Sequence, residues 1–229
     1  ITALALIYAA TGTVNMAELS ERIPELSEGV RTGFSLLLIL VFGIKAGLFP
    51  LFFWLPDSYP TAPGAITAVF AGLLTKVGVY AIIRSQTLLF PPEAQQGSFL
   101  LVLAGFTMVI GVLGALAQDD LRRMLSFHIV SHIGYMIMGL ALFTLAGVAG
   151  AVFYVVHHIV VKTALFLVAG LVERKSGSDR LSRVGGLVRS APMISVLFAL
   201  PALSIAGFPP FSGFVAKFGR AFGRFAPCH

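Results

Sequence analysis

Four of the five lysines in this sequence of 229 residues lie in or beside long apolar stretches, whereas the arginines and the acidic residues lie in loops or at the ends of those stretches. A lysine at the centre of a bilayer costs about 3 kcal/mol on insertion scales. A lysine removed from water can release and regain its proton, whereas an arginine stays protonated. The segregation therefore indicates proton relay rather than permanent charge pairing, and the residues that it selects are Lys45, Lys76, Lys162 and Lys217. The alternative, in which the amine extends to the membrane surface, stays open chiefly for Lys162 and Lys217.

Histidines at helical spacing accompany these lysines. His128 and His132 are four residues apart and share a helix face, and the same spacing relates His158 to Lys162. Histidine titrates near neutral pH, which suits a site that passes protons. For each histidine the alternative is a structural role, with its ring hydrogen-bonded to a neighbouring helix. Hydroxyl groups that could bind these rings or hold water belong to Ser126, Ser131, Tyr135 and Thr163.

Cofactor and metal sites are not expected in this sequence. The pair His128 and His132 has a spacing that zinc ligands use, but no glutamate follows His128 and no third ligand is evident. The lone cysteine, Cys228, cannot form a disulfide within the chain. Glycine-rich phosphate loops, nucleophile elbows and paired buried carboxylates are absent from the sequence. The sequence therefore favours a transporter subunit over an enzyme, with no catalytic residues of its own.

Seven apolar stretches carry the candidate residues. The sequence is 57% hydrophobic and only 11% charged, whereas soluble domains carry about 25% charged residues. A backbone that crosses lipid must satisfy its own hydrogen bonds, so each stretch is predicted to be a helix. The prediction is an all-α membrane protein, a bundle of about seven spans at 1–12, 32–55, 63–84, 99–117, 123–144, 148–172 and 191–206.

The net charge of +6 does not indicate a nucleic-acid partner, because the basic residues are spread over short loops between the apolar stretches. If the stretches alternate sides, one side of the membrane receives the larger share of basic residues. That side is predicted to be cytoplasmic. Its basic residues are Arg122, Arg123, Arg174, Lys175, Arg180, Arg183 and Arg189.

Two of the spans are predicted to be broken. Pro50 follows Lys45 within an apolar stretch and removes a backbone donor there. The second break is predicted around Gly207, Pro209 and Pro210. Broken helices at membrane depth are typical of transporters, in which they line a cavity. A plain proline kink or the end of a span is the alternative at both places.

Several runs together resemble the signature of the antiporter-like membrane subunits, a family that includes proton-pumping subunits of respiratory complex I, membrane-bound hydrogenase subunits and large subunits of Mrp-type Na+/H+ antiporters. The runs are Lys45-Ala-Gly-Leu-Phe-Pro-Leu-Phe-Phe-Trp-Leu-Pro-Asp57, Gly72-x-x-x-Lys76-Val-Gly-x-Tyr80-x-x-x-Arg84, Ser131-His-Ile-Gly-Tyr135, His158-x-x-x-Lys162 and Gly207-Phe-Pro-Pro-x-Ser-Gly-Phe214-x-x-Lys217. Within the family, the loop at 12–20 is similar to the corresponding loop in the D subunits of Mrp antiporters. Complex I members usually carry histidine where this sequence has Phe52 and Tyr59, which also favours the Mrp branch.

The resemblance implies a fold of fourteen helices that contains two inverted five-helix repeats. Residues 1–229 would form a single transmembrane domain, a fragment that runs from the end of helix six through helix twelve and covers mainly the second repeat. Lys45 would lie on helix seven, Lys76 on helix eight, and His158 and Lys162 on helix eleven. Lys217 would be the terminal relay residue of broken helix twelve. The family's helix-five glutamate, which pairs with the helix-seven lysine, would lie outside this sequence.

The expected function is that of an ion-translocating subunit in a multisubunit monovalent cation/proton antiporter. Protons would pass along the intramembrane lysines and histidines in exchange for Na+ or K+, and the partners would be other membrane subunits and the lipid bilayer. The expected location is the plasma membrane of a prokaryotic-type cell. One alternative is the homologous proton-pumping subunit of an NADH:quinone oxidoreductase or a membrane-bound hydrogenase, without a redox site of its own. The other alternative is a membrane scaffold that does not conduct.

Overall fold

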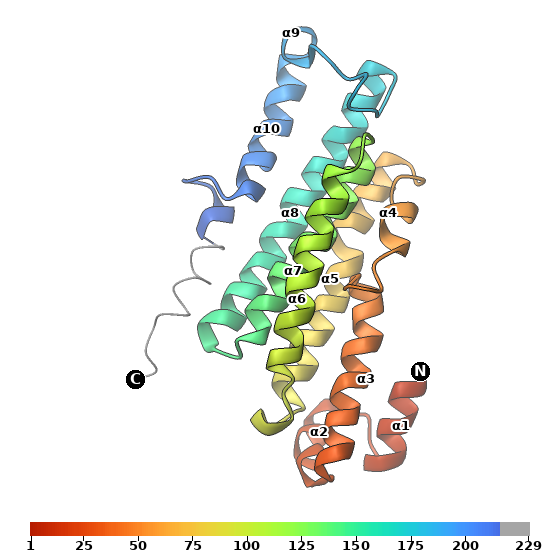
Figure 1. Ribbon diagram of the computed structural model, residues 1–229, viewed down its shortest axis with the longest axis vertical. Helices are drawn as coiled ribbons and strands as arrows, with labels where there is room; N and C mark the ends of the chain where they lie inside the picture. The colour runs from red at the N-terminus through yellow and green to blue at the C-terminus, as the bar shows by residue number, and fades with distance from the viewer. Residues whose placement is uncertain (216–229) are drawn as a thin grey trace.

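The computed structural model describes residues 1–215, and in that part of the chain the regular structure is helical, without β-strands (Figure 1). Two single-turn 3-10 helices, Ile23–Glu25 and Pro92–Ala94, accompany the α-helices. The α-helices are α1 Thr2–Thr11, α2 Met16–Arg22, α3 Glu28–Ala46, α4 Trp54–Ser58, α5 Gly64–Leu88, α6 Gly97–Leu116, α7 Leu121–Ala141, α8 Leu145–Ser176, α9 Leu187–Ser190 and α10 Pro192–Ala206. The prediction of an all-α chain is confirmed.

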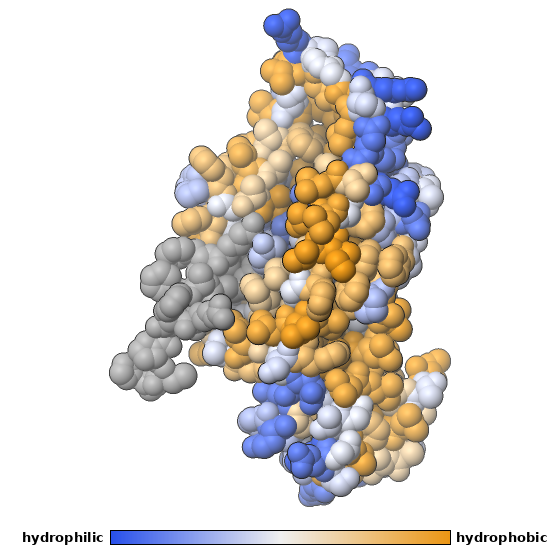
Figure 2. Space-filling model, in the orientation of Figure 1, coloured by the Kyte–Doolittle hydropathy of each residue, from blue (hydrophilic) through white to orange (hydrophobic). Residues whose placement is uncertain are grey.

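Within the described residues, five helices, α3, α5, α6, α7 and α8, are long and apolar enough to cross a membrane. Figure 2 shows hydrophilic residues gathered towards the two ends of the elongated molecule and hydrophobic residues over much of the part between them. Five of the seven predicted spans therefore have a helix of sufficient length. The remaining two correspond to the shorter apolar helices α1 and α10, for which a full crossing stays a prediction.

The helix bundle has α5, α7 and α8 at its centre. Helix α6 packs on α7, α5 packs on α8 and α3, and α7 and α10 both pack on α8. Figure 1 shows α3 and α10 on opposite sides of these central helices. The buried core lies between α5, α7 and α8, and it includes Val79, Ile129, Ile133 and Leu165. In lipid, close packing of this kind rather than escape from water holds helices together.

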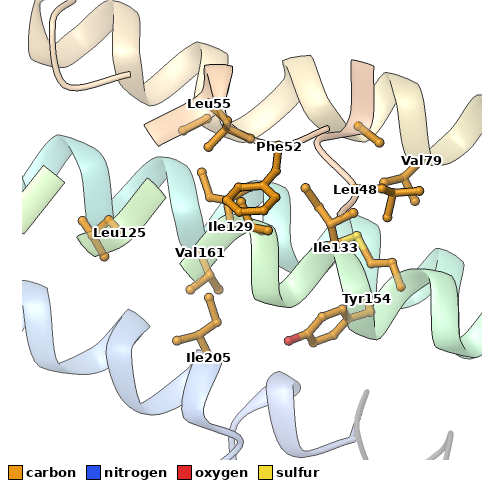
Figure 3. Packing of buried hydrophobic residues seen from close by; sticks show 14 of the residues in the cluster. Leu48, Phe52, Leu55, Val79, Leu125, Ile129, Ile133, Tyr154, Val161 and Ile205 are labelled. Carbon is orange, nitrogen blue, oxygen red and sulfur yellow. The ribbon is translucent and has the colours of Figure 1, made fainter. Parts of the chain in front are cut away.

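The segment between α3 and α4 packs into the same core. Leu48 and Phe52 of this segment, and Leu55 in the first turn of α4, are almost completely buried. Figure 3 shows Phe52 and Leu55 facing Ile129 of α7. The chain after α3 is therefore an integral part of the bundle rather than a surface loop.

The predicted breaks at Pro50 and at Gly207–Pro210 both coincide with helix ends. Helix α3 ends at Ala46, and α10 ends at Ala206. In each case the next residue is a glycine in the left-handed conformation, Gly47 with φ 81° and Gly207 with φ 86°, which suits a residue without a Cβ. A cis proline follows in both segments, at Pro50 and at Pro210. Helical backbone resumes at Trp54 in the first case and at 212 in the second.

Polar contacts at one end of the bundle join the two predicted basic loops to each other and to α4. Arg122 pairs with Glu173 at the end of α8, and Arg123 pairs with Asp57 of α4 at 3.0 Å. The loop after α8 is fixed to the turn before α7, since the N–H and the hydroxyl of Ser182 both donate to the Asp119 carboxylate. The structure thus gathers at one end the basic loops that the sequence assigns to one side.

Candidate functional site

Three central helices bring four of the candidate residues together in the core. Lys76 comes from α5, His132 from α7, and His158 and Lys162 from α8. Lys162 and His158 are fully buried, Lys76 is 2% exposed and His132 is 8% exposed. His158 lies within electrostatic range of both lysines and of His132. The contact of α5 with α8, which sequence spacing does not reveal, joins Lys76 to the predicted pair His158 and Lys162.

Backbone carbonyls hold the two buried amines. The Nζ of Lys76 donates to the carbonyl of Ala71 within its own helix. The Nζ of Lys162 donates across helices to the carbonyl of Leu125 at 3.3 Å. Neither bond needs the positive charge, because a neutral amine also has N–H groups to donate. These environments therefore suit amines that gain and lose a proton.

His158 has an unusual position among the buried polar groups. Within residues 1–215, neither of its ring nitrogens has a hydrogen-bond partner, although the residue is fully buried. A buried polar group left unpaired costs about 1–3 kcal/mol, so such groups are normally paired by protein or by ordered water. Both nitrogens of His158 are therefore available to a water molecule or to a proton in transit.

A row of aromatic side chains leads from His158 to a cavity. The ring centroids of His158 and His132 are 5.3 Å apart, and those of His132 and His128 are 6.0 Å apart. His128 and His132 line a cavity of about 350 Å³ between α6, α7, α8 and α10, together with Ser131 and Tyr135. The predicted i, i+4 pair on α7 thus reaches from the buried core to a space large enough for several water molecules.

His157, the neighbour of His158, lies on a different side of α8. Its Nδ1 is 3.0 Å from the hydroxyl oxygen of Ser212, in the segment that follows α10. A Cβ added to the next residue, Gly213, would overlap the carbonyl oxygen of Ser204, so this segment packs tightly against the end of α10. Lys217, predicted as the last relay residue, lies outside the described residues.

Lys45 differs from Lys76 and Lys162 because it is exposed in the described part of the chain. It occupies the last turn of α3, just before the left-handed Gly47. The end of α3 approaches α5 so closely that a Cβ on Gly78 would lie 2.6 Å from the backbone nitrogen of Ala46. Lys45 is thus anchored through its backbone beside the helix that carries Lys76, while its side chain faces outward.

Two side chains satisfy the backbone around the end of α3 and the segment that follows it. Thr107 of α6 accepts the N–H of Phe49 at 3.2 Å, and its own hydroxyl donates to the carbonyl of Leu103. The indole N–H of Trp54 donates to the carbonyl of Ile44, near the end of α3, at 2.9 Å. A helix end within a membrane needs such partners, since no water is available in the hydrocarbon to provide them.

Three residues that contribute to the site were not selected from the sequence: Tyr154, Thr107 and Ser212. Tyr154 precedes His158 by four residues, so the spacing that pairs His158 with Lys162 also predicts that Tyr154 lies on their face. The other two could not have been found in this way. Their roles depend on which helix packs beside each break.

Helical stretches with buried lysines and histidines at their centre define an integral membrane protein of the antiporter-like class. Residues 1–224 match the family described as NADH:quinone oxidoreductase/Mrp antiporter, TM, and the chain belongs to that family.

Two curated relatives carry the name of the D subunit of a Na(+)/H(+) antiporter. The protein from Alkalihalophilus pseudofirmus is 48% identical over 98% of this chain and 46% of its own length. The protein from Bacillus subtilis is 44% identical over 96% of this chain and 45% of its own length. The chain therefore spans less than half the length of these relatives.

Solved membrane complexes contain chains of the same fold. A chain of the Mrp complex from Dietzia sp. DQ12-45-1b is 40% identical with a TM-score of 0.91, and the match covers 98% of this chain and 42% of that one. A chain of respiratory complex I from Thermus thermophilus is 29% identical with a TM-score of 0.88, covering 98% of this chain and 48% of that one. The match to a chain of an archaeal membrane-bound sulfane sulfur reductase has 31% identity and a TM-score of 0.90, over 97% and 46% of the two chains.

Proposed function

We propose that this chain is part of an ion-translocating subunit of a multisubunit monovalent cation/proton antiporter, in which protons move in exchange for Na+ or K+. The observation that carries the proposal is the burial of Lys76, Lys162 and His158 within electrostatic range of one another across two helices. Intramembrane ionisable residues of this kind mark ion pathways. The names of the two curated relatives support exchange of Na+ for protons.

The proposed pathway runs from Lys76 through His158 to His132 and then to the cavity at His128. Lys162 lies beside this pathway and adjusts it electrostatically. Two unit charges 5.3 Å apart, the separation of the His132 and His158 rings, repel by about 3 kcal/mol at an effective dielectric constant of about 20. A proton on one group therefore lowers the proton affinity of the next, and protons advance singly.

The two proline-containing segments are proposed to interrupt membrane spans. Each combines a helix end at a left-handed glycine with a return to helical backbone a few residues later. In this arrangement α3 with α4 and α10 with the helical residues from 212 onward each form one broken helix. They would be helices seven and twelve of a fourteen-helix fold with inverted repeats, and residues 1–229 would supply helices six to twelve as one transmembrane domain. In the same fold, the amine of Lys45 is proposed to pair with a carboxylate on a segment outside this chain. The exposure of Lys45 in the described residues supports this part of the proposal.

The proposed partners are other membrane subunits, and the proposed location is the plasma membrane. The solved matches are chains of membrane complexes, and the two antiporter relatives come from bacteria. Large hydrophobic side chains are exposed along α6, among them Phe106, Val109 and Leu113, which suits contact with lipid or with neighbouring helices.

The second candidate function is that of a proton-pumping subunit in a redox-driven complex. The matches to chains of complex I and of the sulfane sulfur reductase, with TM-scores of 0.88 and 0.90, support this second function. The same buried residues would carry protons, with electron transfer elsewhere providing the energy. A scaffold that does not conduct is disfavoured, because fully buried lysines are costly to retain without a role.

Transport in everted vesicles tests the proposal. The full-length protein is assembled with its companion subunits, an acid-inside pH gradient is formed, and Na+ or K+ is added while a pH-sensitive dye is followed. Wild-type protein is expected to collapse the gradient, Lys76→Ala to abolish the collapse, and Lys175→Ala to leave it unchanged, because Lys175 is exposed at the end of α8. If the assembled wild-type complex collapses no gradient with either cation, the antiporter proposal is wrong and the redox-driven pump is favoured.

A further inference from the structure

Gly72 of α5 lies at a close approach between α5 and α8. A Cβ added to Gly72 would be 2.3 Å from Oγ1 of Thr163 and 3.5 Å from the carbonyl oxygen of Ile159, both on α8. The first distance is about 1 Å shorter than the 3.4 Å at which ordinary van der Waals contact begins. A side chain at this position therefore requires either a rearrangement of Thr163 or a wider separation of the two helices.

The close approach lies among the buried ionisable groups of the two helices. Lys76 follows Gly72 by about one turn of α5. On α8, the two residues that Gly72 faces directly follow His158 and Lys162. All three ionisable residues are buried, and His158 is within electrostatic range of both lysines. The separation of the helices at Gly72 therefore controls the distance between Lys76 and the ionisable residues of α8.

We infer that Gly72 is a positioning residue for proton transfer, because the absence of a side chain there lets α5 bring Lys76 close to the two buried ionisable residues of α8. The inference rests on the proposed function, since it concerns a step of the proposed pathway. A proton passes between two groups that are within hydrogen-bond distance or joined by one water molecule. A misplacement of about 1 Å can slow such a step by as much as about a hundredfold.

A methyl group at position 72 forces one of two adjustments. Either the hydroxyl of Thr163, which donates to the carbonyl of Ile159 at 2.8 Å, rotates away, or α5 and α8 move apart. Two of the three staggered rotamers of threonine leave its hydroxyl or its methyl group at the overlapping position, so rotation offers a single way out. The overlap is with a side chain rather than with backbone, so Gly72→Ala is expected to assemble. Its exchange rate per assembled complex is expected to fall by on the order of tenfold.

Removal of the opposing hydroxyl tests the spacing directly. In Thr163→Ala a Cβ at position 72 would meet only the carbonyl oxygen of Ile159 at 3.5 Å and the Cβ of residue 163 at 3.7 Å, which are ordinary contacts. Thr163→Val instead retains the branched shape of the side chain. Exchange is measured in vesicles, and each double variant is compared with the single variant at 163. Gly72→Ala should leave the rate of Thr163→Ala unchanged and should slow Thr163→Val by about tenfold.

Gly147 provides a control in which packing is lost far from the lysines. A Cβ there would lie 2.7 Å from the carbonyl oxygen of Gly139, and Gly147 is about 16 Å along α8 from His158. Gly147→Ala is therefore expected to lower the temperature at which the purified complex loses its assembled state. Its exchange rate per assembled complex should stay at the wild-type value, because the contact of α5 with α8 at Gly72 is unchanged.

The outcomes separate this inference from the proposed function. A wild-type rate in Gly72→Ala, an equal loss in Gly147→Ala, or a loss that Thr163→Ala does not restore overturns the positioning role. A wild-type complex that exchanges neither cation refutes the antiporter function and the transport role of Gly72 with it. The heat stability of the same variants then still decides whether residues 72 and 163 meet, because Thr163→Ala should restore the stability that Gly72→Ala loses.

Discussion

The contact between Gly78 of α5 and the end of α3 provides a quantitative test of how these two helices pack. A Cβ at Gly78 would lie 2.6 Å from the nitrogen of Ala46 and 3.0 Å from both the Ala46 Cα and the carbonyl carbon of Lys45. All three are backbone atoms, so no side-chain rotation relieves the overlap. Gly78→Ala must therefore push the end of α3, and Lys45 with it, away from α5.

The expected cost follows from two opposing effects. Overpacking of a well-packed site costs about 1–3 kcal/mol, and a clash with backbone belongs in the upper part of that range. Replacing glycine by alanine inside a helix returns up to about 1 kcal/mol. The net expectation for Gly78→Ala is a loss of about 1–2 kcal/mol in the free energy of unfolding.

Gly105 of α6 provides the matched control, because a Cβ added there meets nothing within 4 Å. Gly105→Ala should therefore show only the gain in helix propensity. The assay heats the detergent-purified complexes and measures the fraction that stays monodisperse, alongside exchange in vesicles. Gly78→Ala is expected to lose monodispersity at a lower temperature than wild type and to exchange more slowly, whereas Gly105→Ala is expected to match or exceed wild type. Equal stability and equal exchange rates in the two variants would show that α3 and α5 do not approach as described.

Three further predictions concern polar contacts. Thr107→Val removes the partner of a backbone N–H in the segment after α3 and should lower stability by about 1–3 kcal/mol in the same heating assay; an unchanged midpoint would mean that the segment is held otherwise. Arg122→Ala should lower the free energy of unfolding by about 2 kcal/mol, because the Arg122 side chain is 11% exposed and ion-paired. Arg123→Ala should lower it by less than about 1 kcal/mol, because both members of its ion pair are exposed. Equal effects of the two substitutions would contradict this order. Hydrogen bonds from Ser182 hold the pKa of the Asp119 carboxyl below its ordinary value of 3.8. The stabilisation that these bonds give the loop is therefore fully present above pH 3.8, and it is lost as the pH falls through the lowered pKa. Proteolysis of this loop by an acid-active protease should therefore rise over that acidic interval in wild type, and Ser182→Ala should remove most of the pH dependence.

The sequence predicted the class of fold and the positions of two helix ends for identifiable physical reasons. Long apolar stretches leave only helices as a solution in lipid, and Pro50 and Gly207 mark helix ends through their backbone properties. Helical spacing also placed His158 with Lys162 and His128 with His132. These inferences use local chemistry, which a single sequence contains.

The arrangement between helices could not be predicted in the same way. Helices α5, α7 and α8 carry apolar residues on all sides, so no polar face indicates which side meets which neighbour. The approach of Lys76 to His158 and the outward position of Lys45 both depend on that choice. The spacing of Tyr154 and His158 places them on one face of a helix, but the contact of Tyr154 with His132 of α7 depends on how two helices pack.

The adjacent residues His157 and His158 give α8 the role of a two-sided link. Successive residues on an α-helix point about 100° apart, and here one ring contacts the segment after α10 while the other lies among the buried lysines. A rotation of α8 as a rigid body would turn both rings by the same angle. A movement of the segment at Ser212 that rotates α8 through the contact with His157 would therefore also change the surroundings of His158 at the centre of the bundle.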